Sequence, residues 1–195
     1  TVTTNAAVTG NGFDGIFART TGASATTVNV GGTVVGAVVG VRARNNAGSG
    51  SVNVNDAGGF AITGLADDGI QATADTGTIN VGSGVGNRIN GAVTGFDDGI
   101  QAVGNGSINV FTGNNVTGTT DEGIVAVSSG AGTAVVVNST GGTIKAQTNG
   151  IETSATAAGS TSSVTNTDAI NVATGTAILT ATGTGSNTVN NTGAL

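Results

Sequence analysis

Short segments in which aliphatic and polar residues alternate recur along the whole chain, as in VNV at 28–30 and INV at 79–81. An alternation with a period of two is typical of a β-strand that buries one face and exposes the other. The starts of consecutive segments lie 24 to 29 residues apart. The set comprises VNV at 28–30 and 52–54, INV at 79–81 and 108–110, VVV at 135–137, VTN at 164–166 and VNN at 189–191.

A second pattern lies between these segments and consists of two aliphatic residues seven or eight positions apart, as in VTGFDDGIQA at 93–102. In six of seven copies a glycine stands directly before the second aliphatic residue, where we expect a positive φ as the chain turns a corner. Each repeat therefore predicts three short strands: the VNV-like segment, the V/I-T-G segment and the G-I-x-A segment. The pairs are Val8/Ile16, Val34/Val41, Ile62/Ile70, Val93/Ile100, Val116/Ile124, Ile144/Ile151 and the weaker Ile170/Ile178.

A period of about 27 residues without helical spacing favours a parallel β-helix over helical repeats, and it is too short for propeller blades of about 40 residues. The 195 residues accommodate about seven such coils. We therefore expect an all-β solenoid, a parallel β-helix with three short strands per coil. Residues 1–195 would form one domain, either a segment of a longer secreted protein or a subunit that stacks on its copies.

Stacked coils lie about 4.8 Å apart, so equivalent positions should form columns along the solenoid. The pattern predicts an inward aliphatic column of Val28, Val52, Ile79, Ile108, Val135, Val164 and Val189. It predicts an outward polar ladder of Thr27, Asn29, Ser51, Asn53, Thr78, Asn80, Ser107 and Asn109. We interpret the ladder as a solvated face whose hydroxyls and amides bond along the stack. The alternative is a Thr/Asn array that matches ice, although Ala134 and Val136 interrupt it.

Carboxylates recur at the corner, just before the glycine that precedes the second aliphatic residue, and we call this set the acidic corner. The turn itself does not require them, because Val39 and Asn149 occupy the same position in other repeats. Stacking would place like charges about 5 Å apart. Either the side chains splay into water, or Ca²⁺ binds among their oxygens. The acidic corner comprises Asp67, Asp68, Asp97, Asp98, Asp121 and Glu122.

Composition excludes several classes of chemistry. The chain has no cysteine and no histidine, which removes disulfides, thiolate catalysis and the commonest general base and metal ligand. Its net charge of −6 argues against nucleic acid as a partner.

The chain has neither a bilayer-spanning apolar run nor a secretion signal, so we expect a mature segment or one cut from a larger protein. The five phenylalanines are expected to fill corners or an outer shell, or to stack sugar rings if they form an exposed row.

The V-T-G-x-D-D-G-I-x-A corners and the Gly/Thr/Asn/Val/Ala-rich coils resemble the passenger regions of bacterial autotransporters, which are exported through type V secretion. This resemblance covers nearly the whole chain. It implies export through the Gram-negative envelope, a right-handed parallel β-helix, and a role in adhesion, aggregation or display at the cell surface. The catalytic motif of protease-bearing members cannot be carried over, since no histidine is present to activate a serine.

Together these features predict a non-enzymatic, extracellular structural or adhesive module that binds a cell-surface or matrix ligand through its lateral surfaces and loops, such as 82–90 with Arg88. No cofactor is expected apart from the Ca²⁺ considered above. One alternative is self-assembly, since both ends stop within the strand pattern and an uncapped solenoid invites end-to-end stacking into a filament. Another is an enzyme acting on polysaccharide through Asp97 and Asp98.

Overall fold

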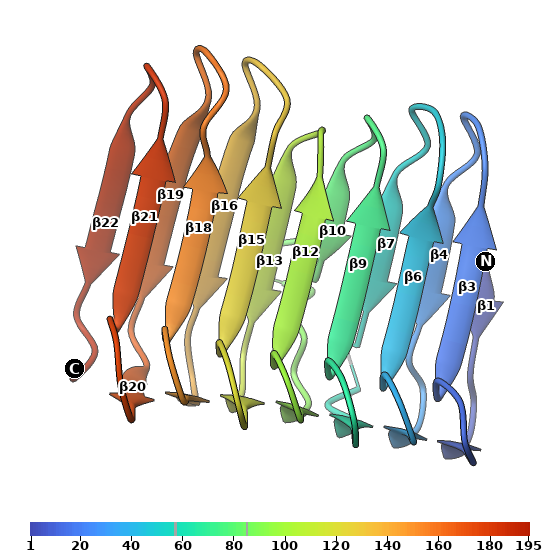
Figure 1. The fold of residues 1–195 in the computed structure, drawn as a ribbon. Helices are drawn as coiled ribbons and strands as arrows, with labels where there is room; N and C mark the ends of the chain where they lie inside the picture. Colours follow the sequence, from blue (N-terminus) through green and yellow to red (C-terminus); the bar gives the residue numbers. More distant parts are fainter. Residues whose placement is uncertain (57, 85) are drawn as a thin grey trace.

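The computed structural model describes residues 1–56, 58–84 and 86–195, and these residues form a solenoid of parallel β-sheets (Figure 1). The chain passes in turn through three sheets, which we name A, B and C, and each passage makes one coil. The predicted all-β solenoid of about seven coils with three strands per coil is confirmed. No helix among the described residues has the length and apolar character needed to cross a bilayer.

Sheet A lies behind sheet C in Figure 1, and the short strands of sheet B close the solenoid at the bottom of the view. Sheet A contains β1 (Val2–Thr3), β4 (Thr26–Asn29), β7 (Val52–Asn55), β10 (Ile79–Val81), β13 (Ile108–Thr112), β16 (Ala134–Ser139), β19 (Thr161–Asn166) and β22 (Asn187–Asn191). Sheet B contains β2 (Val8–Gly10), β5 (Val34–Gly36), β8 (Ile62–Gly64), β11 (Val93–Gly95), β14 (Val116–Gly118), β17 (Thr143–Ala146) and β20 (Ala169–Val172). Sheet C contains β3 (Ile16–Thr20), β6 (Val41–Asn45), β9 (Ile70–Ala74), β12 (Ile100–Gly104), β15 (Ile124–Ser128), β18 (Ile151–Ala155) and β21 (Ile178–Thr182).

The core is a column of branched aliphatic side chains along the solenoid axis. Each sheet contributes residues in register, such as Ile79 beside Ile108 in sheet A and Ile100 beside Ile124 in sheet C. These four side chains are fully buried. Burying an isoleucine or valine stabilises a fold by about 1.5 to 3 kcal/mol, but here each side chain is covered only because the neighbouring coils are in place.

The register of sheet A differs from the predicted column at two places. Val28 pairs with Val54 rather than Val52, and Val164 pairs with Val137 rather than Val135. The predicted alignments of Val28 with Val52 and of Val135 with Val164 are therefore wrong. The shift is two residues in each case, so the same side chains still face the interior.

Buried hydroxyls account for both shifts. Thr26 pairs with Val52, is 2% exposed, and its Oγ1 donates to the carbonyl of Arg44 at 2.8 Å. Ser162 pairs with Val135, is 1% exposed, and its Oγ lies 2.5 Å from Thr153 Oγ1. Because these hydroxyls find partners inside the solenoid, each can occupy a core position that an aliphatic residue fills in other coils.

The expectation of a positive φ at the corner glycines, such as Gly69 and Gly99, is wrong. The glycines with positive φ lie at other positions, such as Gly82 and Gly84. The role of the corner glycines is close approach between coils. A Cβ on Gly99 would lie 2.5 Å from Val116 Cγ1 and 2.6 Å from the carbonyl oxygen of Gly123. A Cβ on Gly69 would similarly lie 2.6 Å from Val93 Cγ1. The glycine therefore makes room for the first aliphatic residue of the following coil.

Candidate functional site

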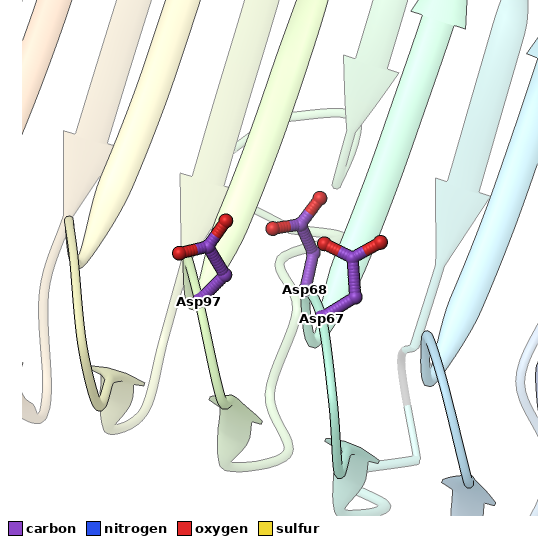
Figure 2. Close-up of side chains that lie close together, drawn as sticks. All are labelled: Asp67, Asp68 and Asp97. Atoms are coloured by element: carbon purple, nitrogen blue, oxygen red, sulfur yellow. The ribbon is translucent and has the colours of Figure 1, made fainter.

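The acidic corner is the turn that joins sheet B to sheet C, and stacking brings its carboxylates together. Asp67 and Asp68 come from the turn between β8 and β9, and Asp97 comes from the equivalent turn one coil further along (Figure 2). One carboxylate oxygen from each of these three residues lies within 4.8 Å of the other two. A second group with the same spacing consists of Asp98, Asp121 and Glu122. The sequence pattern thus located the cluster correctly.

The second carboxylate of each turn points into the protein. Asp68 is fully buried and Asp98 is 4% exposed, so the expectation that these side chains splay into water is wrong for both. Asp68 Oδ1 accepts the main-chain N–H of Asp98 at 3.2 Å, and Asp98 Oδ1 accepts that of Glu122 at 3.0 Å. Each carboxylate therefore satisfies a buried donor of the next coil, which would otherwise lack a partner.

The same bond recurs at another acidic corner, where Asp14 Oδ1 accepts the N–H of Val39 at 3.2 Å. It also recurs at an uncharged corner, where Asn149 Oδ1 accepts the N–H of Thr176 at 3.1 Å, so the bond depends on an acceptor rather than on a charge. The corner residues form one line of hydrogen bonds parallel to the solenoid axis. Val39 interrupts this line in the second coil, since it has no side-chain acceptor.

Two glutamines complete the buried part of the acidic corner, and sequence reasoning missed them. Gln71 Nε2 donates to Asp68 Oδ2 at 2.8 Å, and Gln101 Nε2 donates to Asp98 Oδ2 at 3.2 Å. Each glutamine stands three residues after its aspartate, in the repeated string DDGIQA. The recurrence of that glutamine was the available signal.

Burial changes the proton affinity of these carboxyl groups. It raises the pKa of Asp68 to about 6, against the opposing hydrogen bond from Gln71. It raises the pKa of Asp98 to about 8, and the negative charge of Asp68 adds to the effect. The pKa of Glu122 is raised first by burial and then by its neighbour Asp121. A carboxylate in a low-dielectric site beside another carboxylate favours its protonated form.

The first carboxylate of each turn is half-buried and has partners at the surface. Asp67 Oδ2 lies 3.3 Å from an Arg42 terminal nitrogen, and Arg42 Nε lies 3.2 Å from Asp14 Oδ2. Asp121 Oδ1 accepts the hydroxyl of Thr148 at 2.7 Å. Arg42 thus links the corners of the first and third coils.

These hydrogen bonds bear on whether the acidic corner fits a calcium ion. Carboxylate oxygens are suitable ligands, but Ca²⁺ takes about six to eight of them. In the first group both oxygens of Asp68 and one of Asp67 already accept hydrogen bonds. Hydrogen bonding and raised pKa values explain how the carboxylates lie so close together. Calcium binding by the acidic corner, the alternative considered from the sequence, is disfavoured by these hydrogen bonds.

The polar ladder on the outer face of sheet A bonds along the stack, as interpreted from the sequence. Asn80 Nδ2 donates to Asn53 Oδ1 at 2.8 Å, and Asn109 Nδ2 donates to Asn80 Oδ1 at 3.0 Å. Because of the register shift, Thr27 lies beside Asn53 and Asn29 beside Asn55. Val136 follows Asn109 and ends the amide line. Ser51, Thr78 and Ser107 are half-buried on the same face.

Arg88 lies against sheet A instead of extending from a free loop. Its terminal nitrogens donate to the carbonyl oxygens of Thr112 and Asn138, both at 3.0 Å, and to Asn138 Oδ1 at 2.8 Å. The guanidinium carbon also lies 5.8 Å from the centre of the Phe111 ring. The adjacent Ile89 is fully buried. Arg88 therefore fastens its loop to β13 and β16.

The chain matches no protein-family model, and neither a curated protein nor a solved structure matches it significantly.

Proposed function

We propose that this chain is a non-enzymatic structural and adhesive module of a bacterial cell surface, which presents its lateral faces and turns to a ligand. The single observation that carries this proposal is the register of the outer faces. Equivalent polar side chains, such as Asn53, Asn80 and Asn109, repeat along the solenoid on a rigid sheet. A surface with a regular repeat suits multivalent contact with an extended ligand, where linked weak contacts give strong binding.

The chemistry of the acidic corner supports a structural role. Asp98 is 4% exposed, and its oxygens accept hydrogen bonds from Gln101 and from the next coil. A general acid or base must come within hydrogen-bond reach of a substrate, and this carboxyl group is instead engaged inside the fold. The resemblance to autotransporter passengers supports an extracellular location on the Gram-negative surface.

Adhesion is tested with beads that carry the purified chain, passed in flow over Gram-negative bacteria and over epithelial cells. We expect saturable retention on one of these surfaces, inhibited by the soluble folded chain and not by chain unfolded in urea. Retention equal to that of albumin-coated beads on both surfaces would contradict the proposal. Turnover of pectin, alginate or peptidoglycan that Asp97→Asn abolishes would instead support an enzyme.

A second candidate function is end-to-end association into a filament. It is favoured by the repeat itself, since each coil offers the next the same three parallel strands, so that a coil of one copy can stack on a coil of another. Electron microscopy of the purified chain tests this: filaments with a repeat of one subunit support association, and separate short rods contradict it.

A further inference from the structure

The outer face of sheet C carries an aromatic and basic patch at the first two coils. Phe17 pairs with Arg42, and Arg19 pairs with Arg44, on strands β3 and β6. These four side chains share the outward face, since alternate residues of a strand point to the same side. Phe17 is 55% exposed. The patch holds three of the five basic residues of a chain whose net charge is −6.

A surface cavity of about 310 Å³ opens beside this patch, lined by Phe13, Asp14, Phe17, Val38 and Arg42. Phe13 is 77% exposed and comes from the turn that joins β2 to β3. Asp14 and Arg42 form an ion pair of 3.2 Å within the lining. Small-molecule sites range from about 300 to 1,000 Å³ and combine apolar walls with a few polar groups. This cavity accommodates a group about the size of one ring.

We propose that this cavity binds a sugar ring of an acidic glycan, meaning a polysaccharide whose rings carry carboxylate groups. The proposal rests on the adhesive function proposed above and names the ligand class for it. A pyranose ring has an apolar C–H face, which packs against a phenylalanine ring, and a rim of hydroxyls. Asp14 can accept a hydrogen bond from such a hydroxyl, and Arg42 can donate one.

The charges of the patch favour an acidic ring over a neutral one. Among the described residues, the ion pairs of this face are those of Arg42 with Asp14 and Asp67. Arg44 instead bonds to the neutral amide of Gln71, and Arg19 is exposed. Burial lowers the pKa of Arg44, and the charge of Arg42 lowers it further. A ligand carboxylate beside Arg19 and Arg44 would offset this repulsion and form charge-assisted hydrogen bonds.

A nucleic acid would fit the same elements less well. Phenylalanine can stack a base, and arginine can bind a phosphate. The cavity lining, however, includes the carboxylate of Asp14. That carboxylate can accept a hydrogen bond from a sugar hydroxyl, whereas a phosphodiester has no hydrogen to donate to it. An oligonucleotide therefore serves as the competing ligand in the test.

Isothermal titration of the full chain tests the proposal with three probes: tetragalacturonate, its fully methyl-esterified form, and a tetramer of thymidylate. We expect tetragalacturonate to bind, and to bind more tightly than the ester, which has the same rings without the charge. Phe17→Ala should weaken tetragalacturonate binding about tenfold. Arg19→Gln should bring the affinities of the acid and the ester close together.

Two matched variants control for unspecific effects. Phe96→Ala removes another phenylalanine that is 49% exposed, and Lys145→Gln removes another exposed basic residue, which lies on sheet B. Both should leave the affinity within about twofold of the unchanged chain, a difference of about 0.4 kcal/mol. Because Phe17 and Arg19 face outward, urea unfolding should show that their variants remain folded.

Three results would overturn the glycan site. One is an absence of binding by tetragalacturonate. Another is equal weakening by Phe17→Ala and Phe96→Ala. The last is tighter binding of the thymidylate tetramer than of either glycan. If beads carrying Phe17→Ala still adhere as well as the unchanged chain, the glycan site is wrong while the adhesive function stands.

Discussion

The side chain of Asp68 and the main-chain N–H of Asp98 are joined by a hydrogen bond of 3.2 Å across two consecutive coils. The bond repeats one coil later, from the N–H of Glu122 to Asp98 at 3.0 Å. A side chain that bonds to the next coil supplements the main-chain ladder of the sheets. It also ties the protonation of a buried carboxyl group to the contact between coils.

We predict that the chain is more stable in mildly acidic than in alkaline solution. In the folded chain the pKa of Asp68 is raised to about 6 and that of Asp98 to about 8, whereas an unfolded aspartate has a pKa of about 3.9. The folded state therefore binds these protons more tightly. The associated stabilisation is fully present below about pH 4 and is lost as pH rises through about 6 and then 8. The midpoint of thermal unfolding should fall between pH 5 and pH 9.

Asp98→Asn provides the control for this pH dependence. Asparagine keeps an acceptor for the N–H of Glu122, as Asn149 does for Thr176, but it does not titrate. The variant should lose part of the decline between pH 5 and pH 9. A thermal midpoint that rises with pH in the unchanged chain would contradict the raised pKa values.

Asp98→Ala should destabilise the chain at every pH. It removes the acceptor of a buried N–H, and an unsatisfied buried donor costs about 1 to 3 kcal/mol. The free energy of unfolding from urea titration measures the loss. Asp98→Asn should recover most of it, because the acceptor is restored. Equal losses in the two variants would mean that the charge, rather than the acceptor, stabilises the corner.

Calcium is expected to have little effect on stability, because hydrogen bonds already engage both oxygens of Asp68. An ion that binds only the folded chain must raise the unfolding midpoint with its concentration. Thermal unfolding should therefore give similar midpoints in Ca²⁺ and in EDTA. A midpoint that rises progressively with Ca²⁺, and does so less in Asp97→Asn, would demonstrate a calcium site at the acidic corner.

The fold could be predicted from sequence because the solenoid repeats one strong pattern. Aliphatic residues such as Ile79 and Ile108 recur at the spacing of one coil. Within each strand, the alternation of aliphatic and polar residues predicts which side is buried. The predicted register was wrong where a polar residue occupies a core position that an aliphatic residue fills in other coils. Thr26 and Ser162 are core residues, but their hydroxyls are acceptable there only because of partners on sheet C. Those partners cannot be identified before the coils are stacked.

The acidic corner shows the same limit. The recurrence of Asp68 and Asp98 located a cluster, but their orientation depends on an N–H contributed by the following coil. The sequence also could not show that Gly99 serves close packing, since that requires the position of Val116. The sequence likewise could not predict the patch of Phe17 and Arg19 or its cavity, because both bring together residues from two coils and from a turn.

Gly99→Ala should destabilise the chain through a steric clash. The added Cβ would lie 2.5 Å from Val116 Cγ1 and 2.6 Å from the carbonyl oxygen of Gly123, in the next coil. Inserting a methyl group into a closely packed site costs about 1 to 3 kcal/mol. Gly86→Ala is the matched control, since a Cβ there meets no atom within 4 Å. Urea unfolding should separate the two variants, and a Gly99→Ala chain as stable as Gly86→Ala would contradict the close approach.

Arg88→Lys should loosen the chain at 86–90 without unfolding the solenoid. Lysine retains the charge but cannot reproduce the fork of donors that reaches Thr112 and Asn138 together. Arg88 itself is half-buried and the substitution leaves the aliphatic core unchanged, so the global free energy of unfolding should change by less than about 1 kcal/mol. Amide hydrogen exchange should nevertheless quicken at Asn87, whose N–H bonds within the loop to Gly84. The amide of Asn109 in β13 should exchange at its original rate, because its strand keeps both neighbours. Faster exchange at both sites would mean that Arg88 supports the sheet as well as the loop.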